Sequence, residues 1–476
     1  MLFNSLRFAI FLSIVFAVYW LAPHRLRWVA LLTFSAYFYT CWGVKYIFIL
    51  ADVIIVSYLA ALIVAKTERC RKLILAVAIV LCILPLFVFK YFNFAADTLS
   101  AILSPFGINL HTSTLKLIVP VGVSFFTFQA TGYVIDVYRK KIKPEKHLGY
   151  YALFVSFFPQ ISSGPIGRAD KLIPQFREEK VFDYDNAVYG LRLILIGFFK
   201  KLVVADNLAV YVDKVYGNLH NMSGFSLILA AFFYSIQIYC DFSGYTDIAR
   251  GAAKLLNINL MENFRSPYFS SSVKELWSRW HISLSTWFRD YVYIPLGGNR
   301  VSKARNCVNL MVTFLLSGLW HGADWTFVMW GGVHGAAQVG EKLLKTGDKN
   351  ARGIRRSLRI AAVFIFTTAA WVLFRADSIS DAFYLFGNCL NGIGNPRSYI
   401  SSGILSIGLT TKSILWRTLL YIVPLAVYDW KSLDHDLIAE MSGLKTWSRH
   451  IIYALLIIVI TVFHAYSSSG FVYFQF

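Results

Sequence analysis

Runs of apolar residues long enough to cross a lipid bilayer recur from one end of this 476-residue sequence to the other. A helix needs about 20 mostly apolar residues to cross the hydrocarbon core. Hydrophobic residues make up 57% of the chain and charged residues 15%, whereas soluble domains average roughly 45–50% and 25%. The pattern predicts an all-α polytopic membrane protein with about 11–13 transmembrane helices.

The apolar runs divide the chain into a long core and a shorter extension. We expect residues 1–375 to form the transmembrane core, with its motif-rich part at about 240–340, and residues 376–476 to form a C-terminal extension with two further spans. The segment 376–412, rich in Gly, Asn and Ser, is expected to be a loop. The expected spans are approximately 5–22, 28–43, 46–65, 73–89, 115–137, 148–160, 187–205, 223–242, 306–320, 325–343, 358–375, 413–428 and 449–466.

The positive charges are grouped in particular links between the spans. The net charge is +20, and the links after the first, third and fifth spans are the basic ones, at residues 24–27, 66–72 and 139–146. Because basic links stay on the cytoplasmic side, this alternation predicts that the N-terminus lies on the outer side of the cell membrane. No soluble basic face interleaved with aromatic residues is available, so we expect no nucleic acid partner.

Two polar segments interrupt the apolar pattern in the middle of the chain. "QISSGPIGR" (160–168) carries Pro and Gly where a helix would have to continue. "CDFSGYTDIARGAAKLL" (240–256) has a polar start, in which Asp241 and Ser243 suit the N-cap of a short helix that follows. Broken backbone at membrane depth must be buried in protein or line a wet cavity. The two segments therefore predict a re-entrant core around a cavity, flanked by ordinary spans, although a wet transport path would leave the same pattern.

Three of the ten histidines lie in apolar surroundings. His321 follows an apolar helix in "LLSGLWHG", where it could face a cavity or simply tie two helices together. His281 lies in "WSRWHISLSTWFRDYVY"; if that stretch is one helix, Trp277, His281 and Leu284 share a face, and tryptophan stripes usually serve packing. His334, among glycines, is expected to reflect close helix packing.

Motifs of soluble enzymes are missing from the sequence. There is no HExxH, no Cys/His cluster, no GxSxG, no Walker loop and no Rossmann fingerprint. We therefore expect no metal site and no permanently bound cofactor.

Three motifs, in order, resemble those of the membrane-bound O-acyltransferase (MBOAT) family. They are "MENFRSPY" from residue 261, "LWSRWHISLSTWFRDYVYIPLGGNR" from residue 276 and "LLSGLWHGADWTFVMWGGVHG" from residue 315. Within this family the chain is most similar to the alginate O-acetylation type, and the D-alanyl transferases of teichoic acid modification are related to it. The resemblance covers most of the chain.

The resemblance implies a funnel through the bilayer with a catalytic histidine near its middle. By motif match, His321 is that histidine and His281 the second functional histidine. The acyl donor, acetyl-CoA or an acyl carrier protein, would enter from the cytoplasm. The acetyl group would pass toward an extracytoplasmic polysaccharide through an SGNH-hydrolase-like acetyltransferase partner, at the bacterial cytoplasmic (inner) membrane. The residues expected to contact substrate or line the tunnel are Trp277, Trp280, Ser285, Trp287, Asp290 and Trp320.

Other functions agree with parts of the same sequence. Transfer of D-alanyl or another acyl group would use the same histidines. A polysaccharide transporter or permease would account for the polar broken segments, although neither a nucleotide-binding domain nor an internal repeat is visible. A scaffold that only recruits the partner enzyme would leave His321 dispensable, so substitution of this residue separates the hypotheses.

Overall fold

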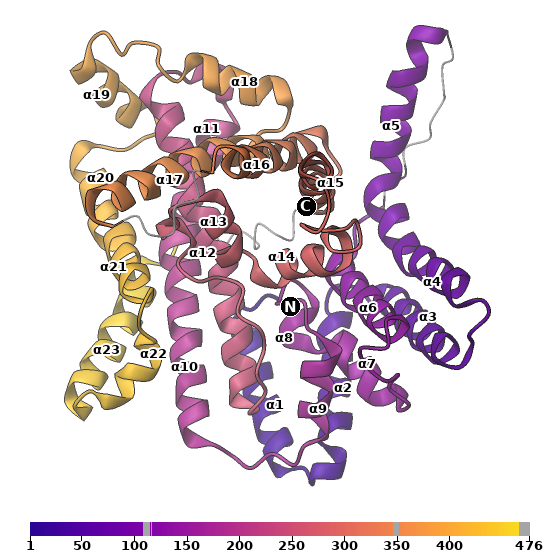
Figure 1. Cartoon of the computed structure of the whole chain (residues 1–476). Coiled ribbons are helices and arrows are strands. Elements are labelled where there is room, and N and C mark those ends of the chain that lie inside the picture. Colours follow the sequence, from indigo (N-terminus) through magenta and orange to yellow (C-terminus); the bar gives the residue numbers. More distant parts are fainter. Residues whose placement is uncertain (108–114, 116, 346–351, 466–476) are drawn as a thin grey trace. The chain divides into compact units, whose positions relative to one another are not determined.

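The computed structural model describes residues 1–107, 115, 117–345 and 352–465, and every regular element in these ranges is a helix (Figure 1). Five of the helical stretches are long and apolar enough to cross a membrane: α3 (Tyr46–Lys66), Arg71–Phe106, α12 (Phe225–Leu255), α17 (Gly353–Arg375) and α23 (Thr446–Phe463). The protein is a polytopic all-α membrane protein, as the sequence predicts. The larger number of spans stays a prediction.

The described residues of 1–191, together with 249–261, form one compact unit. In this unit α3 packs against α4 and α6. A π-helical turn, Phe87–Tyr91, joins α4 to α5. The helices of the unit besides α3 are α1 (Leu6–Leu21), α2 (His24–Thr40), α4 (Arg71–Leu86), α5 (Phe92–Leu103), α6 (Val123–Tyr138), α7 (Leu148–Ser156), α8 (Phe158–Ile161) and α9 (Ala169–Arg177).

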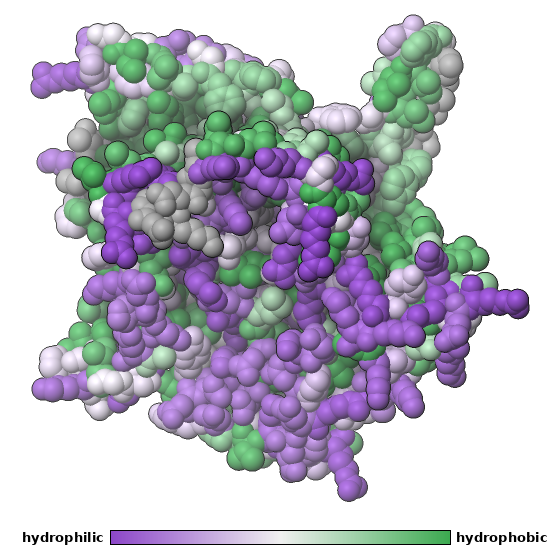
Figure 2. Space-filling model, viewed as in Figure 1, coloured by the Kyte–Doolittle hydropathy of each residue, from purple (hydrophilic) through white to green (hydrophobic). Residues whose placement is uncertain are grey.

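The surface of α5 is strongly apolar. Leu99 and Ile102 on this helix are about half exposed, and Figure 2 shows the helix as a mainly hydrophobic surface. Exposed apolar side chains on this scale are unfavourable in water and favourable against lipid chains. The surface of α5 therefore agrees with the membrane assignment.

The backbone breaks at "QISSGPIGR", as expected from its Pro and Gly. Helix α8 ends at Ile161, and no helix follows until α9 begins at Ala169. Ser162 and Ser163 in this break are buried. The side chain of Gln160 donates to the carbonyl of Phe154 at 2.7 Å. The broken segment is thus enclosed by protein and is tied to the end of α7 by a side-chain hydrogen bond that it donates.

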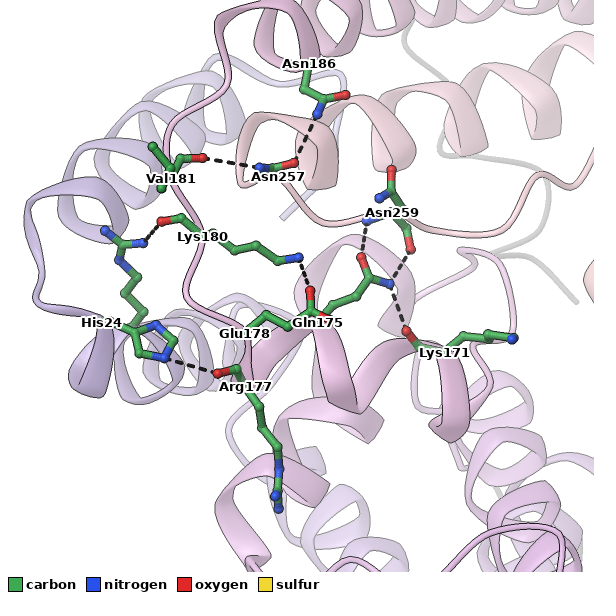
Figure 3. Close-up of polar contacts among 11 residues, drawn as sticks. His24, Lys171, Gln175, Arg177, Glu178, Lys180, Val181, Asn186, Asn257 and Asn259 are labelled. Atoms are coloured by element: carbon green, nitrogen blue, oxygen red, sulfur yellow. Dashed lines mark hydrogen bonds and ion pairs between the residues drawn. The ribbon is translucent and has the colours of Figure 1, made fainter.

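A polar network ties the residues just after α12 to α9 and to the segment that follows α9 (Figure 3). The backbone N–H of Asn259 donates to Gln175 Oε1 at 2.7 Å, and Gln175 Nε2 donates to the carbonyl of Asn259 at 3.1 Å. Asn257 donates to the carbonyl of Val181 at 3.2 Å. Because Asn257 has a left-handed backbone (φ 55°), these bonds fix the direction in which the chain leaves α12.

Residues 192–248 and the described residues after 261 form the second compact unit. Short π-helical turns follow α10, α14 and α20, at Phe199–Ala205, Arg289–Tyr293 and Thr418–Ile422. The helices, besides α12, α17 and α23, are α10 (Tyr184–Phe198), α11 (Asp206–Tyr216), α13 (Val273–Arg279), α14 (Ile282–Phe288), α15 (Lys303–His321), α16 (Trp325–Leu343), α18 (Ile379–Asn388), α19 (Pro396–Ser406), α20 (Thr411–Arg417), α21 (Val423–Lys431) and α22 (Leu437–Glu440).

Helix α12 runs without a break through the segment in which the sequence suggested one. Asp241 does not cap a helix: its carboxylate, which is buried, pairs with Lys201 Nζ at 2.7 Å. Asp247, six residues later on the same helix, pairs with Lys200 Nζ at 2.7 Å. The expected break at 240 is therefore wrong, because buried lysines from the turn after α10 satisfy these carboxylates inside the helix.

The expected loop at 376–412 is also wrong, since it contains α18 and α19. Ser378 caps α18 by accepting the N–H of Asp381 at 3.1 Å, and Asn395 caps α19. The extension belongs to the second unit and packs on its helix α10, where Arg192 donates to the carbonyl of Ile438 at 2.9 Å. Two of the polar residues in this segment, Ser378 and Asn395, are helix caps. The core–extension boundary at residue 375 stays a prediction, and residues 466–476 of the extension lie outside the described residues.

Candidate active site

The stretch that carries His281 is two short helices with a sharp bend between them. Ser272 caps α13 by accepting the N–H of Glu275 at 3.0 Å, and α13 ends at Arg279. Trp280 is extended, and His281 has a left-handed backbone with φ 44° and ψ 53°. Helix α14 then begins at Ile282. The prediction of one continuous helical face through Trp277 and His281 is wrong, because the backbone turns at His281.

The bend is held by a strand-like pairing with the segment 263–265. The carbonyl of Asn263 accepts the N–H of Ile282 at 2.9 Å, and the N–H of Arg265 donates to the carbonyl of Arg279 at 2.9 Å. The side chain of Asn263 accepts the N–H of Ser283 at 3.2 Å. The motif "MENFRSPY" thus lies against "SRWHIS" on both sides of the bend.

His321 is the last residue of α15, at a tight turn into α16. Asp324 caps α16 by accepting the N–H of Thr326 at 2.7 Å. The two helices touch backbone to backbone: a Cβ on Gly318 would lie 2.2 Å from the carbonyl oxygen of Phe327, and one on Gly331 would lie 2.3 Å from that of Phe314. The close approach at these glycines holds the end of α15, which carries His321, against α16.

The two histidines are brought together inside an aromatic shell. Their ring centroids are 6.3 Å apart, and their residues are 0% and 3% exposed. The ring of His281 packs against Phe242 at 4.8 Å. The ring of His321 packs against Trp330 at 5.2 Å and Phe374 at 5.3 Å. Two imidazoles in such an enclosure can act on one small substrate group.

The protonation of His281 follows from its burial. His281 lies outside the five candidate spans. Burial lowers the pKa of its imidazole to about 3, because the surrounding protein disfavours the charged form. A neutral imidazole can accept a proton or donate a hydrogen bond. His281 is therefore neutral at neutral pH and suits a hydrogen-bonding role, whereas a pKa so far below 7 does not suit a general base.

The predicted tunnel residues differ in their distance from the histidines. Trp320 contacts both, with ring centroids 6.0 Å from His281 and 5.0 Å from His321. Ser285 lies in the first turn of α14, where its N–H donates to the carbonyl of His281 at 2.9 Å and its hydroxyl to the carbonyl of Trp280 at 3.1 Å. These contacts place Trp320 at the site and Ser285 in the bend beside it.

Trp277 and Trp280 belong to the shell around the site. Trp277 packs on Trp330 at 5.7 Å, and its Nε1–H donates to His334 Nδ1 at 3.3 Å. Trp280 packs between Phe264 at 5.0 Å and Trp371 at 4.9 Å. Both tryptophans are buried. His334, which the sequence indicated only as a packing residue, thus links α16 to α13 by a hydrogen bond.

Trp287 and Asp290 lie further along the chain from the bend. The ring of Trp287 packs on Tyr291 at 5.0 Å. Asp290 forms a partly exposed ion pair with Arg289 at 2.9 Å. Arg279, at the end of α13, pairs instead with Glu275 at 3.0 Å. Arg279 therefore braces α13, and a substrate role of Trp287 or Asp290 stays a prediction.

Sequence reasoning missed Asn263 and the distant members of the aromatic shell. Asn263 was visible only as part of a motif. Phe242 and Phe374 come from long apolar helices, in which nothing distinguishes them from other packing residues. Among the residues that the structure describes, no three His, Cys, Asp or Glu side chains come close enough to hold a metal ion.

Comparison with known proteins agrees with the motifs. Residues 146–376, which include both histidines, match the model of the membrane-bound O-acyltransferase family. The probable alginate O-acetylase AlgI of Azotobacter vinelandii is 37% identical over 434 residues, which cover 90% of this chain and 85% of that protein. The peptidoglycan O-acetyltransferase of Helicobacter pylori is 32% identical over 482 residues, covering 93% and 90%.

A relative of lower sequence identity is named for the transfer of a different acyl group. The teichoic acid D-alanyltransferase of Bacillus subtilis is 28% identical over 329 residues, which cover 65% of this chain and 76% of that protein. Family model, relatives and apolar helices agree on the class of the protein. The chain belongs to the membrane-bound O-acyltransferase family and is an O-acyltransferase of the membrane.

Proposed function

We propose that the chain moves an acetyl group from a cytoplasmic thioester across the cell membrane toward an extracytoplasmic polysaccharide. The observation that carries this proposal is the pair of buried histidines, His281 and His321, with ring centroids 6.3 Å apart. The relatives named as O-acetylases of alginate and peptidoglycan support acetyl as the group and a polysaccharide as its destination. The donor is acetyl-CoA or an acyl carrier protein.

His321 acts as the base in the transfer step. It takes the proton of the acceptor hydroxyl while the hydroxyl oxygen attacks the thioester carbonyl. The C–O bond forms, the C–S bond breaks, and the imidazolium returns its proton to the leaving thiolate, which is released as a thiol. Such a positioned base typically contributes about 10²–10⁴-fold to the rate. His281 stays neutral beside it and supports the reacting groups.

The acceptor hydroxyl belongs to an extracytoplasmic SGNH-hydrolase-like acetyltransferase, which passes the acetyl group to the polysaccharide. The chain lies in the cytoplasmic (inner) membrane of a bacterium, with its N-terminus outside. The basic links at 24–27, 66–72 and 139–146 support this orientation. They also offer positive charge to an anionic donor on the cytoplasmic side.

The test is a His321→Ala variant in the source organism, with the exposed His450→Ala variant as the matched control. We expect His321→Ala to insert and fold but to leave the surface polysaccharide without O-acetyl esters, measured as acetate released by mild base. His450→Ala should acetylate normally. Undiminished acetylation in His321→Ala overturns the proposal.

The same hydrolysate tests the related reaction that the D-alanyltransferase relative suggests. Release of D-alanine in place of acetate, lost in His321→Ala, would show that the chain transfers D-alanyl groups. Release of acetate alone supports the acetyl proposal.

A further inference from the structure

The backbone of His281 has a conformation that must be imposed from outside. With φ 44° and ψ 53° it is left-handed, which costs a non-glycine residue about 1–3 kcal/mol and persists only where the surroundings over-determine it. His281 is also fully buried. The direction of its ring therefore depends on whatever holds this turn.

Asn263 holds the turn from a distance of eighteen residues along the chain. The first N–H groups of a helix have no partner within the helix and are usually capped by the residue just before it. His281 occupies that position in α14 but makes no capping bond with its side chain. Asn263 takes its place, accepting Ile282 N–H on its carbonyl at 2.9 Å and Ser283 N–H on Oδ1 at 3.2 Å.

Asn263 is itself held by its burial and by the packing of the next residue. It is 0% exposed. The next residue, Phe264, packs on Phe242 at 5.0 Å and on Trp280 at 5.0 Å. Phe242 in turn contacts the ring of His281. Asn263 therefore cannot shift without moving the wall against which His281 packs.

We propose that Asn263 is a positioning residue that holds the His281 ring toward His321. The inference rests on the proposed function and adds to it a residue that acts through His281. An asparagine suits this place because its side-chain oxygen accepts the Ser283 N–H without burying a charge. Without that acceptor the start of α14 is no longer held in place, and the His281 ring loses its orientation toward His321.

The test uses inside-out membrane vesicles from the source organism, with acetyl-CoA labelled in its acetyl group as the probe. Label in base-labile esters gives kcat per folded chain and an apparent KM. We expect Asn263→Ala to lower kcat at least about 10-fold with little change in KM, since a misplaced group loses rate rather than donor affinity. Asn263→Asp, which keeps the shape and the acceptor oxygen but buries a carboxyl group, should recover part of the rate.

Asn309→Ala is the matched control. Asn309 is also a buried asparagine, and it fastens a loop by donating to the carbonyl of Leu296 at 3.0 Å. It lies twelve residues before His321 on α15, about 18 Å along the helix. We expect Asn309→Ala to lower the amount of folded chain while kcat per folded chain stays normal.

The outcomes separate this inference from the proposed function. Equal kcat in Asn263→Ala and wild type, or an equal loss in Asn309→Ala, overturns the role of Asn263. If His321→Ala, run in the same vesicles, still transfers the label, the proposed function itself has failed. Loss in His321→Ala and Asn263→Ala, with partial recovery in Asn263→Asp, supports both.

Discussion

The rings of His281 and His321, forty residues apart in the sequence, lie with their centroids 6.3 Å apart in the structure. Each ring is carried by a helix end, His281 at the start of α14 and His321 at the end of α15. Helix ends are held by caps and close contacts and lack the full hydrogen bonding of a helix interior. The distance between the histidines therefore depends on a few contacts, which can be changed one at a time.

The contact between α15 and α16 should be sensitive to one methyl group. In Gly318→Ala the new Cβ would lie 2.2 Å from the carbonyl oxygen of Phe327, so the helices must separate three residues before His321. We expect a loss of about 1–3 kcal/mol in stability and at least tenfold in acetyl transfer. Gly332→Ala is the control, because its Cβ would meet only Leu315 Cδ2 at 3.6 Å. Equal behaviour of the two variants in thermal denaturation and transfer assays would contradict the packing argument.

At position 281 the usual order of stability, in which an alanine variant is more stable than a glycine variant, should be reversed. Because the residue is left-handed, His281→Gly should be more stable than His281→Ala by about 1 kcal/mol. Both variants should lose acetyl transfer. At His450, inside α23, the order should be the ordinary one, with Gly about 1 kcal/mol less stable than Ala. Melting temperatures of the four variants in detergent provide the measurement, and a less stable His281→Gly would argue against the left-handed turn.

Burial of His281 predicts how stability changes with pH. Its pKa is lowered to about 3 in the folded chain, while the unfolded residue has its ordinary value of about 6.5. Between these values the unfolded state binds the additional proton, so stability rises with pH through this window and falls on acidification. From pH 7 to pH 5 this group should cost about 2 kcal/mol. The difference in Tm between wild type and His281→Asn should shrink over that range, and a constant difference would refute the effect.

The hydrogen bond between Trp277 and His334 should contribute to stability. Trp277→Phe keeps an aromatic ring against Trp330 but leaves the buried Nδ1 of His334 without its donor. We expect a loss of about 1–3 kcal/mol. Trp447→Phe, at an exposed position, should have little effect. Because removal of both partners costs less than removal of one, Trp277→Phe combined with His334→Phe should be less destabilised than the sum of the single variants.

The buried lysine inside the second unit should be more important for stability than a surface lysine. Lys201 Nζ lies 2.7 Å from both Asp206 and Asp241, and all three side chains are almost inaccessible to solvent. Lys201→Met leaves two buried carboxylates without this cation, which should cost about 3–5 kcal/mol. Lys171→Met, in an exposed pair with Asp170, should leave the thermal denaturation curve in detergent unchanged. A mild effect at Lys201 would mean that the carboxylates are neutralised in another way.

Local sequence patterns were sufficient to predict those elements whose signal lies within a short stretch of the chain. Apolar length predicted α3, α17 and α23, and the Pro and Gly of "QISSGPIGR" predicted the break before α9. Polar residues misled where their partners are remote. Asp241 resembles a helix cap in the sequence, but in the structure it pairs with Lys201. The Ser and Asn residues after Arg375 resemble a loop, but Ser378 and Asn395 among them cap α18 and α19.

The amino-acid sequence by itself determined the membrane class, the family and the motif positions of His281 and His321, because apolar length and residue order are local properties. Only the tertiary structure decided that the two rings adjoin and that His281 lies in a left-handed turn. It also decided that Asn263 caps α14, the helix that begins directly after His281. These features arise from contacts between segments far apart in the chain. No periodicity within one segment encodes the distance between two helix ends.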